Sequence, residues 1–532
     1  MKSLKLFSLA VICLVAMAAT AQNQSKTQMN AQKLGTTLYL LENFYVDTAN
    51  IDKVTEDAII AALKELDPHS AYISKKDVEK MNEPLVGSFE GIGVTFQLIR
   101  DTITVISPTA GGPSEKVGIM AGDQFIKIDG EDAFGKKVDN EYVQKHLRGK
   151  KGTKVTVSVK RGNDPELIDF EITRDKIPLN SINAAYMLDN HVGYIKLDRF
   201  AQESTNEFKG ALTKLQSQGM ESLIFDLRGN TGGYLNVAIE LVDQFLENDK
   251  LVVFTEGIHS PRQEWNSSKS GLYTNGKLVV LIDEGSASAS EIFSGAMQDH
   301  DRGVVIGRRS FGKGLVQRPF NLPDGAQIRL TTSRYHTPSG RCIQRPYENG
   351  VEDYAKEMTK RLEHGEYFHA DSIHFPDSLK YKTDGGRTVY GGGGIMPDIF
   401  IPVDTAYNSK LYTNLVRKGA LNRFTTDYGL KHRDEIKAQY ADFESYNKNF
   451  TVGQSLIDGL KKAAVEAKVE WDDEQFAHSE KFLLLQMKAL IARNVWETQQ
   501  YYQVMSATDP GIQKAMEILG NEKQYKSILR GK

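Results

Sequence analysis

Three serines alternate with alanines at a point where a buried strand gives way to a helix. The apolar run Leu278–Ile282 predicts a strand, and apolar residues recur at helical spacing over Ile292–Met297. Ser286, Ser288 and Ser290 therefore lie in the turn between them, where the first backbone N–H groups of a helix are unpaired and its dipole favours negative charge. Such a turn can stabilise a serine alkoxide or a tetrahedral oxyanion. The alternative is that small residues only cap the helix.

A lysine between two glycines follows the next apolar run. Gly303–Gly307 predicts another short buried strand, and Gly312, Lys313 and Gly314 come shortly after it. The spacing of Gly307, Gly312 and Lys313 matches a phosphate-binding loop except at the last position, where Gly314 replaces the Ser or Thr that would bind Mg²⁺. The prolines that follow exclude the helix whose N-terminus would receive phosphate. Nucleotide binding is therefore the weaker interpretation.

The lysine can instead serve as the base for a serine nucleophile. An unperturbed lysine has a pKa of about 10.4, and lowering it to roughly 7 to 8 takes on the order of 4 kcal/mol. Desolvation among apolar neighbours such as Phe311, Leu315 and Val316 can supply this. The chain has no Gly-x-Ser-x-Gly or His-Glu-x-x-His motif that would indicate another hydrolase chemistry. The residues therefore favour a Ser–Lys dyad.

Three strings of this sequence resemble those of the C-terminal (tail-specific) processing proteases, serine peptidases of the S41 type. They are Gly285-Ser-Ala-Ser-Ala-Ser-Glu291, Phe311-Gly-Lys-Gly-x-Val-Gln317 and Asp226-Leu-Arg-Gly-Asn-Thr-Gly-Gly233, and the resemblance covers roughly residues 30 to 405. In that family the middle serine is the nucleophile and the lysine lies 25 positions later, which is met here because 313 − 288 = 25. The resemblance thus implies Ser288 as nucleophile and Lys313 as base. Gln317 matches the glutamine that the family has four positions after the lysine.

A glycine-rich turn follows the strand predicted for residues 222–227. Gly232 and Gly233 stand where this strand passes into a helix, and glycines let backbone amides approach a substrate closely. We predict that they form an oxyanion hole with the backbone N–H of Ala289, the residue after the nucleophile. The alternative is an ordinary strand-to-helix turn. Successive strand–helix units of this kind suit the ClpP/crotonase-like α/β core that the resemblance implies.

An upstream segment resembles a PDZ domain of the circularly arranged bacterial type. The loop Gly91, Ile92, Gly93 and Val94 leads into a strand, and further strand patterns and one helix follow up to Val159. Such a loop offers backbone N–H groups to a chain-terminal carboxylate, and the strand edge accepts the peptide by β-augmentation. These four residues are therefore the expected binding site for protein substrates with free, apolar C-termini.

The first 21 residues predict a signal peptide. Lys2 and Lys5 precede the apolar stretch Leu6–Ala18, and Ala19-Thr20-Ala21 suits a cleavage site. We therefore expect an exported protein, periplasmic or otherwise extracytoplasmic, with no integral membrane span after cleavage. Removal of the signal leaves Cys342 as the single cysteine, so neither an intrachain disulfide nor a cysteine metal site is expected. We expect no metal and no cofactor.

Length and charge set the remaining expectations. A formal net charge of −3 gives no basic excess, so nucleic acid is not an expected partner, whereas a homo-oligomer is possible. The predicted fold class is α+β multidomain, with a PDZ domain, the α/β catalytic core and helical N- and C-terminal regions. The expected divisions are residues 1–21 (signal peptide), 22–84 (helical), 85–174 (PDZ), 175–405 (S41-type peptidase core, with an irregular insertion over about 350–390) and 406–532 (helical).

Two functions of different kinds fit these expectations. The first is an exported endopeptidase that selects proteins by their C-terminal tails. The second is a PDZ-type peptide-binding scaffold with an inactive protease site. Because Ser288, Lys313 and Gln317 are all present, the sequence favours the enzyme.

Overall fold

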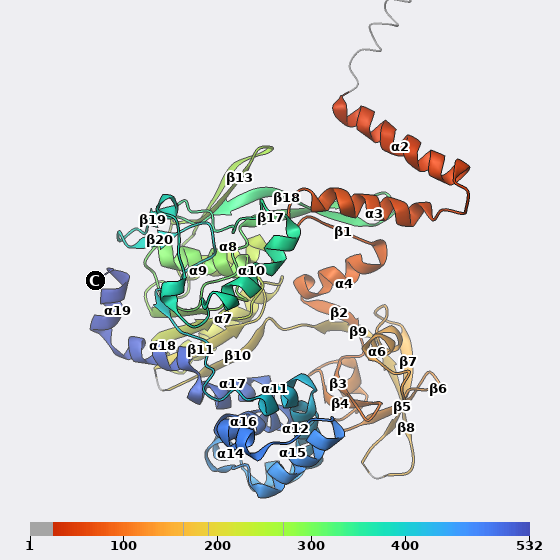
Figure 1. Cartoon of the computed structure of the whole chain (residues 1–532). Coiled ribbons are helices and arrows are strands. Elements are labelled where there is room, and N and C mark those ends of the chain that lie inside the picture. Colours follow the sequence, from red (N-terminus) through yellow and green to blue (C-terminus); the bar gives the residue numbers. More distant parts are fainter. Residues whose placement is uncertain (1–24, 163, 190, 270, 532) are drawn as a thin grey trace, which may run out of the picture. The chain divides into compact units, whose positions relative to one another are not determined.

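The computed structural model describes residues 25–162, 164–189, 191–269 and 271–531 (Figure 1). The expected signal peptide lies outside the described residues. The chain divides into two compact units, one formed by residues up to Lys75 together with Arg318–Thr331, and one formed by Lys76–Gln317 together with Thr332–Lys532. The proposed chemistry belongs to the second unit.

The first unit contains two helices and a strand pairing. Its helices are α2 (Lys26–Phe44) and α3 (Ile51–Lys64), and its short strand β1 (Ala71–Ile73) pairs with the start of β18 (Gln327–His336). The side chain of Asp67 accepts the backbone N–H of His69 at 2.8 Å, which closes the turn between α3 and β1.

A six-stranded antiparallel sheet forms the PDZ domain in the second unit. Its order is β3-β4-β5-β7-β8, with β6 paired to β5. Apolar residues from the strands and from α6 make its core. Two short strands, β2 and β9, pair with each other just outside this sheet. The elements of this region are α4 (Lys75–Val86), β2 (Ser88–Gly91), β3 (Val94–Ile99), β4 (Thr102–Pro108), α5 (Pro113–Lys116), β5 (Gln124–Ile128), β6 (Glu131–Asp132), α6 (Asn140–Leu147), β7 (Lys154–Lys160), β8 (Ile168–Thr173) and β9 (Asp175–Pro178).

A second six-stranded sheet carries the predicted catalytic motifs. Its order is β10-β11-β12-β15-β16-β21, and all its neighbours are parallel except β10 and β11. This arrangement confirms the ClpP-like α/β core. The strands are β10 (Ile182–Met187), β11 (Val192–Leu197), β12 (Ser222–Asp226), β15 (Lys277–Ile282), β16 (Val304–Gly307) and β21 (Ile399–Phe400).

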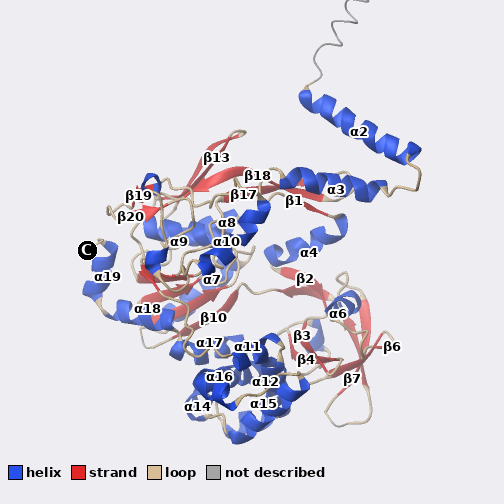
Figure 2. Ribbon diagram, viewed as in Figure 1, coloured by secondary structure: helices blue, strands red, loops and turns tan. Residues whose placement is uncertain are grey.

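Alternate residues of these strands enter two different hydrophobic clusters. On one face, Leu278, Val280 and Ile282 pack with α7 (Ser204–Ser217), α8 (Leu235–Asp243) and α9 (Ala289–Asp299). On the other, Val279 and Leu281 pack with residues of α18 (Pro510–Gly520) and α19 (Glu522–Leu529). The sheet is thus covered on both faces, as its uninterrupted apolar strands require (Figure 2).

Residues between β16 and β21 form further strands and a helix. The expectation of an irregular segment over residues 350–385 is wrong for Val351–Glu363, which forms helix α10. The many charged residues of this segment do not suggest a packed helix. However, Arg361 and Glu357 form an ion pair in which the Arg361 side chain is 2% exposed. The other elements of this region and of the segment between β12 and β15 are β13 (Leu251–Gly257), β14 (Ser260–Asn266), β17 (Leu315–Asn321), η1 (Ala370–Ser372), η2 (Asp377–Leu379), β19 (Lys380–Lys382) and β20 (Thr388–Tyr390).

The C-terminal region is helical, as expected, and has its own core. The spacing of Phe482, Leu483, Met487, Leu490 and Val495 predicts one apolar face of α16, and all of them except the half-buried Phe482 lie in that core. No helix among the described residues is both long enough and apolar enough to span a bilayer. The helices are α11 (Lys410–Arg417), α12 (Ala420–Lys431), α13 (Arg433–Gln439), α14 (Phe443–Asn449), α15 (Gln454–Glu466), α16 (Asp473–Val495), α17 (Thr498–Met505) and η3 (Ser506–Thr508), before α18 and α19.

Candidate active site

The three serines of the predicted nucleophile turn have different environments. Ser286 and Ser290 are fully buried, and each hydroxyl donates to a backbone carbonyl at 2.8 Å, that of Leu227 and that of Asn230 respectively. Ser288 is only half-buried and is the residue from which α9 begins. The three serines therefore differ in exposure, and Ser288 is the one of them that is not fully buried.

Ser288 has an unusual backbone conformation. Its φ is +55° and its ψ is −112°, a combination that L-residues rarely adopt. Such strained backbone clusters at functional sites, where the surrounding structure enforces it. The neighbouring turn packs directly against it, because a Cβ added to Gly232 would lie 2.8 Å from the Cβ of Ser288. Gly232 also has a φ of +100°, so glycine is required there for both reasons.

Asn230 connects the glycine-rich turn to the serine turn. Its carbonyl accepts the N–H of Ala287 at 3.0 Å and the Ser290 hydroxyl, while its side-chain oxygen accepts the N–H of Gly232 at 2.9 Å. The Gly232 amide is therefore engaged within the protein in this conformation. A Cβ added to Gly232 would also lie 2.9 Å from the nitrogen of Ala289. The Ala289 amide and the Cβ of Ser288 therefore both lie directly beside Gly232.

The buried carboxylate of Glu291 joins the serine turn to the lysine loop. One of its oxygens, Oε2, accepts the N–H of Ser288 at 2.8 Å and the N–H of Lys313 at 2.9 Å. The other, Oε1, accepts the N–H of Gly312 at 2.6 Å and the hydroxyl of Ser310 at 2.5 Å. The structure thus brings together the backbones of two residues that are 25 positions apart in sequence.

Burial raises the pKa of Glu291, and the four hydrogen bonds that it accepts oppose this increase. A protonated carboxyl would place a donor among four donors, so this geometry fits the ionised form. Tyr335 adds a second link, since its hydroxyl contacts the carbonyl oxygens of Lys313 at 2.7 Å and Ser288 at 3.1 Å. Our sequence reasoning missed both roles. Glu291 has a local signal, because a glutamate three residues after a serine suits a helix N-terminus, whereas Tyr335 has none.

Lys313 and Gln317 are both half-buried. Lys313 lies near the end of the loop that precedes β17 (Leu315–Asn321), and Gln317 lies in β17 itself. This loop is supported by α10. The guanidinium of Arg361, whose side chain is 2% exposed, donates to the carbonyl oxygens of Ser310 at 2.8 Å and of Phe311 at 3.3 Å. The helix that sequence reasoning overlooked therefore binds the segment that leads into the predicted base.

Three arginines around this loop share two carboxylates. Glu357 of α10 forms ion pairs with Arg361, Arg345 and Arg309, and Glu366 pairs with Arg309 at 2.7 Å. Burial lowers the pKa of Arg309 to about 10, and the neighbouring arginines add to this effect. The guanidinium of Arg345 also lies 4.1 Å from the ring centre of Phe311. The lysine loop is therefore bordered by a largely buried network of ion pairs.

The predicted tail-binding loop borders a small groove in the PDZ domain. A cavity of 90 Å³ lies between β3 and α6, and Ile92, Gly93 and Val94 line it together with apolar residues that include Val143 and Leu147. Strand β3 ends the order of its sheet, so one of its edges remains available to an added strand. The groove and the edge together have the form that β-augmentation requires.

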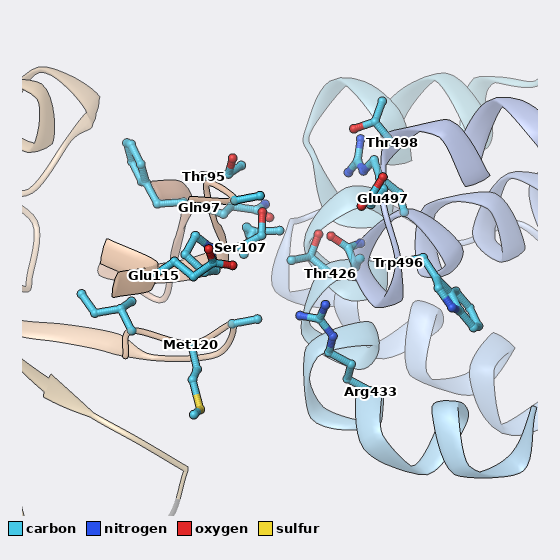
Figure 3. Close-up of a pocket in the computed structure, with 18 of the residues that line it drawn as sticks. Thr95, Gln97, Ser107, Glu115, Met120, Thr426, Arg433, Trp496, Glu497 and Thr498 are labelled. Carbon is cyan, nitrogen blue, oxygen red and sulfur yellow. The ribbon is translucent and has the colours of Figure 1, made fainter. Parts of the chain in front are cut away.

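A larger cavity of 1120 Å³ lies elsewhere in the second unit. Residues of the PDZ domain, among them Glu115 and Met120, line it together with Arg433 and Trp496 of the helical region (Figure 3). None of the predicted catalytic residues lines it. The volume of this cavity is therefore no guide to the position of Ser288, Lys313 and Gln317.

Comparison with known proteins gives matches in three parts of the chain. Residues 191–353 match peptidase family S41, residues 91–172 match the PDZ domain, and residues 411–497 match a family of unknown function (DUF8443). The carboxy-terminal-processing protease of Bartonella bacilliformis is 33% identical over 342 residues, which cover 64% of this chain and 78% of that protein. A probable CtpA-like serine protease of Staphylococcus aureus is 35% identical over 323 residues, which cover 59% of this chain and 63% of that protein.

Solved structures show similar matches. The photosystem II D1 C-terminal processing protease is 28% identical, with 58% of this chain and 88% of that chain covered and a TM-score of 0.33. The PDZ domain of the carboxy-terminal protease from Vibrio cholerae, solved with a peptide, is 34% identical, with 17% of this chain and 99% of that chain covered and a TM-score of 0.16.

Proposed function

Because the chain belongs to the carboxy-terminal-processing proteases of peptidase family S41, we propose that it is a serine endopeptidase with Ser288 as nucleophile and Lys313 as base. One observation supports this most directly, namely the two backbone N–H groups, of Ser288 and Lys313, that share one oxygen of the buried Glu291. A shared acceptor fixes the two segments against each other, as a nucleophile–base pair requires.

In the proposed reaction, neutral Lys313 accepts the proton of the Ser288 hydroxyl as the serine oxygen attacks the substrate carbonyl. The backbone N–H groups of Gly233 and Ala289 face the developing oxyanion, and Gly232 contributes if its bond to Asn230 opens. The lysine ammonium then gives its proton to the departing amine, which leaves an acyl-enzyme that water hydrolyses by the same steps in reverse. Gln317 is assigned to this site by resemblance. The scheme needs no metal and no cofactor.

Lys313 must be neutral for this reaction. Desolvation disfavours an ammonium, and Lys313 is half-buried. The ion pairs of Arg345, Arg361 and Arg309 with Glu357 and Glu366 hold the segment around it in place.

We propose that the PDZ domain selects substrates by their free C-termini. Ile92, Gly93 and Val94, which line the groove between β3 and α6, and Gly91, which precedes them, would face the terminal carboxylate. The last, apolar side chain of the substrate would enter that groove. Export is part of the same proposal and rests on the sequence of the first 21 residues. A scaffold without activity is the alternative, and the two experiments below separate them.

The first experiment compares variants of the predicted dyad in cleavage of an unfolded protein with an apolar free C-terminus. Ser288→Ala and Lys313→Ala should lower kcat by at least about 10³-fold, because the nucleophile or its base is lost. Lys313→Arg should be equally inactive, since a guanidinium stays protonated at any working pH. Ser286→Ala and Ser290→Ala serve as controls and should retain cleavage at reduced stability. Hydrolysis by Lys313→Arg at near wild-type rates would overturn the dyad, and no hydrolysis by the wild type would favour the scaffold.

The second experiment compares matched substrates with free and amidated C-termini. Amidation removes the terminal charge and leaves every side chain, so the loss should fall on recognition by the N–H groups of the loop. A charge-assisted hydrogen bond contributes roughly 1.5 to 3 kcal/mol, which corresponds to about a 10- to 150-fold rise in KM. Equal KM values for the two substrates would show that the PDZ domain does not select the terminus.

A further inference from the structure

The C-terminal end of the chain contacts the glycine-rich turn of the candidate site. Asp509, at the start of α18, accepts two hydrogen bonds from one guanidinium nitrogen of Arg228, at 2.9 and 3.0 Å. Arg228 is the first residue of the turn that continues to Gly232 and Gly233. Asp509 also caps α18, since its side chain accepts the N–H of Ile512 at 3.0 Å. One side chain therefore serves a distant helix and the proposed oxyanion turn.

The other contacts of Arg228 fix its position on the sheet. Its guanidinium donates to the buried carboxylate of Asp226 at 2.6 Å. Its carbonyl oxygen accepts a hydrogen bond from Lys196, whose ammonium also lies 3.7 Å from Asp226. Arg228 thus lies between two carboxylates, one that belongs to β12 and one that belongs to α18. Removal of the second leaves the outer side of the guanidinium without its anion.

The turn after Arg228 passes this constraint to the serine. Gly229 donates its N–H to Asp283 at 2.8 Å, and the same carboxylate oxygen accepts the N–H of Gly285 at 3.0 Å. Asn230 accepts the N–H of Ala287, as described above. A shift of Arg228 therefore moves residues bonded to Asp283 and Ala287, which precede Ser288, and to the Ser290 hydroxyl, which follows it.

The C-terminal helices also bind the strand that leads to the serine turn. The hydroxyl of Tyr525 accepts the N–H of Leu278 at 3.0 Å, and the ammonium of Lys277 donates to the carbonyl of Leu519 at 2.9 Å. Apolar residues of α18, among them Ile512 and Ile518, pack on the face of the sheet opposite α9. These helices are therefore the second covering layer of the catalytic sheet.

We propose that Asp509 is a positioning residue, which through Arg228 sets the geometry of the oxyanion turn. This inference rests on the proposed function. Residues 509–529 lie outside the S41 match at 191–353 and outside the DUF8443 match at 411–497. In this proposal, a segment that neither match covers, residues 509–529, contributes to the peptidase site through Asp509.

The test uses the full chain and two cap variants. Asp509→Asn keeps a good helix cap and removes the anion that faces Arg228. Asn521→Ala is the matched control, because Asn521 caps the adjacent helix α19 by accepting the N–H of Gln524 at 3.1 Å and, in the described part of the chain, its side chain forms no hydrogen bond to the turn. Amide hydrogen exchange over residues 228–234, kcat and KM for an unfolded substrate, and the thermal midpoint are measured for each.

Asp509→Asn should speed exchange of the 228–234 amides by about tenfold or more, since a charge-assisted bond is lost. It should lower kcat by about tenfold and leave KM unchanged, because a misplaced oxyanion turn affects the transition state and not the tail-binding groove. Asn521→Ala should lower the thermal midpoint at least as much, without either effect. Unchanged exchange or unchanged kcat in Asp509→Asn, or equal effects of Asn521→Ala, would overturn the inference.

The exchange measurement does not depend on activity. If the wild type fails to cleave the substrate, the proposed function fails, and the exchange rates of residues 228–234 still decide whether Asp509 positions the turn. Faster exchange confined to Asp509→Asn would support the coupling in that case, and unchanged exchange would reject it.

Discussion

The serine half and the lysine half of the candidate site are stabilised in different ways. The serine half, residues 283–291, is bonded to the neighbouring turn 228–233 through short side chains and backbone groups, such as Ser286, Ser290 and Asn230. The lysine half, residues 308–314, is also bonded to the serine half through Ser286 and Glu291, and in addition it contacts long charged side chains from α10, Arg361 and Glu357. The first half is supported by the sheet and its turns, the second also by a segment further along the chain.

This difference indicates where each half can vary. Backbone contacts between adjacent strand ends follow from the sheet itself, because the carboxyl ends of parallel strands meet at one edge. Contacts from α10 depend on a helix whose residues beyond 353 lie outside the match to family S41. The loop of the base is therefore supported in part by residues outside that match. Tyr335 and the N–H of Phe311, which donates to the Ser286 carbonyl at 2.9 Å, join the two halves. A further meeting point is Glu291, whose carboxylate accepts the N–H groups of Ser288 and Lys313.

The largest expected effect comes from breaking that meeting point. Glu291→Gln replaces a carboxylate oxygen by an amide N–H₂ that faces backbone donors, so the serine turn and the lysine loop should separate. We expect kcat to fall about 100-fold, as for a small displacement of reacting groups. Glu284→Gln is the comparison variant, because its side chain joins the two halves only by an ion pair with Arg308 at 2.7 Å, whereas Glu291 accepts the backbone N–H groups of Ser288 and Lys313.

The measurement is steady-state cleavage by both glutamine variants, with the thermal midpoint recorded for each. Glu284→Gln should stay within about threefold of the wild type, as a partly exposed ion pair contributes little. A Glu291→Gln enzyme with near wild-type kcat would show that the shared carboxylate does not align the two halves.

The sequence predicts the serine half better than the lysine half. The apolar runs at β11, β12, β15 and β16 follow directly from hydrophobic pattern, and the glycines and serines that end them mark the turns. Resemblance supplied the choice among three serines, and the burial of Ser286 and Ser290 now supports it independently. Local pattern was sufficient because each of these elements packs close to its neighbours in sequence order.

The supports from distant segments were beyond sequence reasoning. Arg361 reaches carbonyl oxygens 50 and 51 positions earlier, and Asp509 reaches an arginine 281 positions earlier. A charged residue in a helix normally indicates a solvated face, and only the fold shows that Arg361 is buried. The charged composition of α10 therefore concealed both the helix and its function in the site.

A smaller effect is expected when only the lysine half is loosened. Arg361→Lys keeps the charge but loses the planar fork that donates to Ser310 and Phe311. We expect kcat/KM to fall about tenfold at neutral pH. We also expect the pH optimum to rise, because a loosened loop lets water reach Lys313 and moves its pKa toward the ordinary value.

Lys360→Met provides the control on the same helix, because Lys360 is half exposed and pairs with Asp353 on the surface. The pH–rate profile should distinguish positioning from a general loss of stability. If the optimum of Arg361→Lys stays at the wild-type pH while activity and thermal midpoint fall together, Arg361 supports only folding.

The smallest expected effect separates the two halves by their response to acid. Burial would raise the pKa of Asp226, but the charges of Arg228 and Lys196 outweigh it and hold that pKa well below its ordinary value. Burial would likewise raise the pKa of Glu357, and the charge of Arg361 lowers it. A depressed pKa gives stability that is fully present above the unfolded value and is lost as the pH falls toward the folded one. The unfolded values are about 4.3 for Glu and 3.9 for Asp.

Acid should therefore loosen the lysine half before it loosens residues 226–233, the turn to which the serine half is bonded. Between pH 5 and 3, amide exchange corrected for its intrinsic rate should accelerate first over residues 308–314 and later over 226–233. Each carboxylate changes the opening equilibrium by at most about tenfold per pH unit. In Glu357→Gln the acid response of the first segment should disappear while that of the second remains. Simultaneous loss of protection in the wild type would mean that Glu291 couples the halves too tightly for them to open separately.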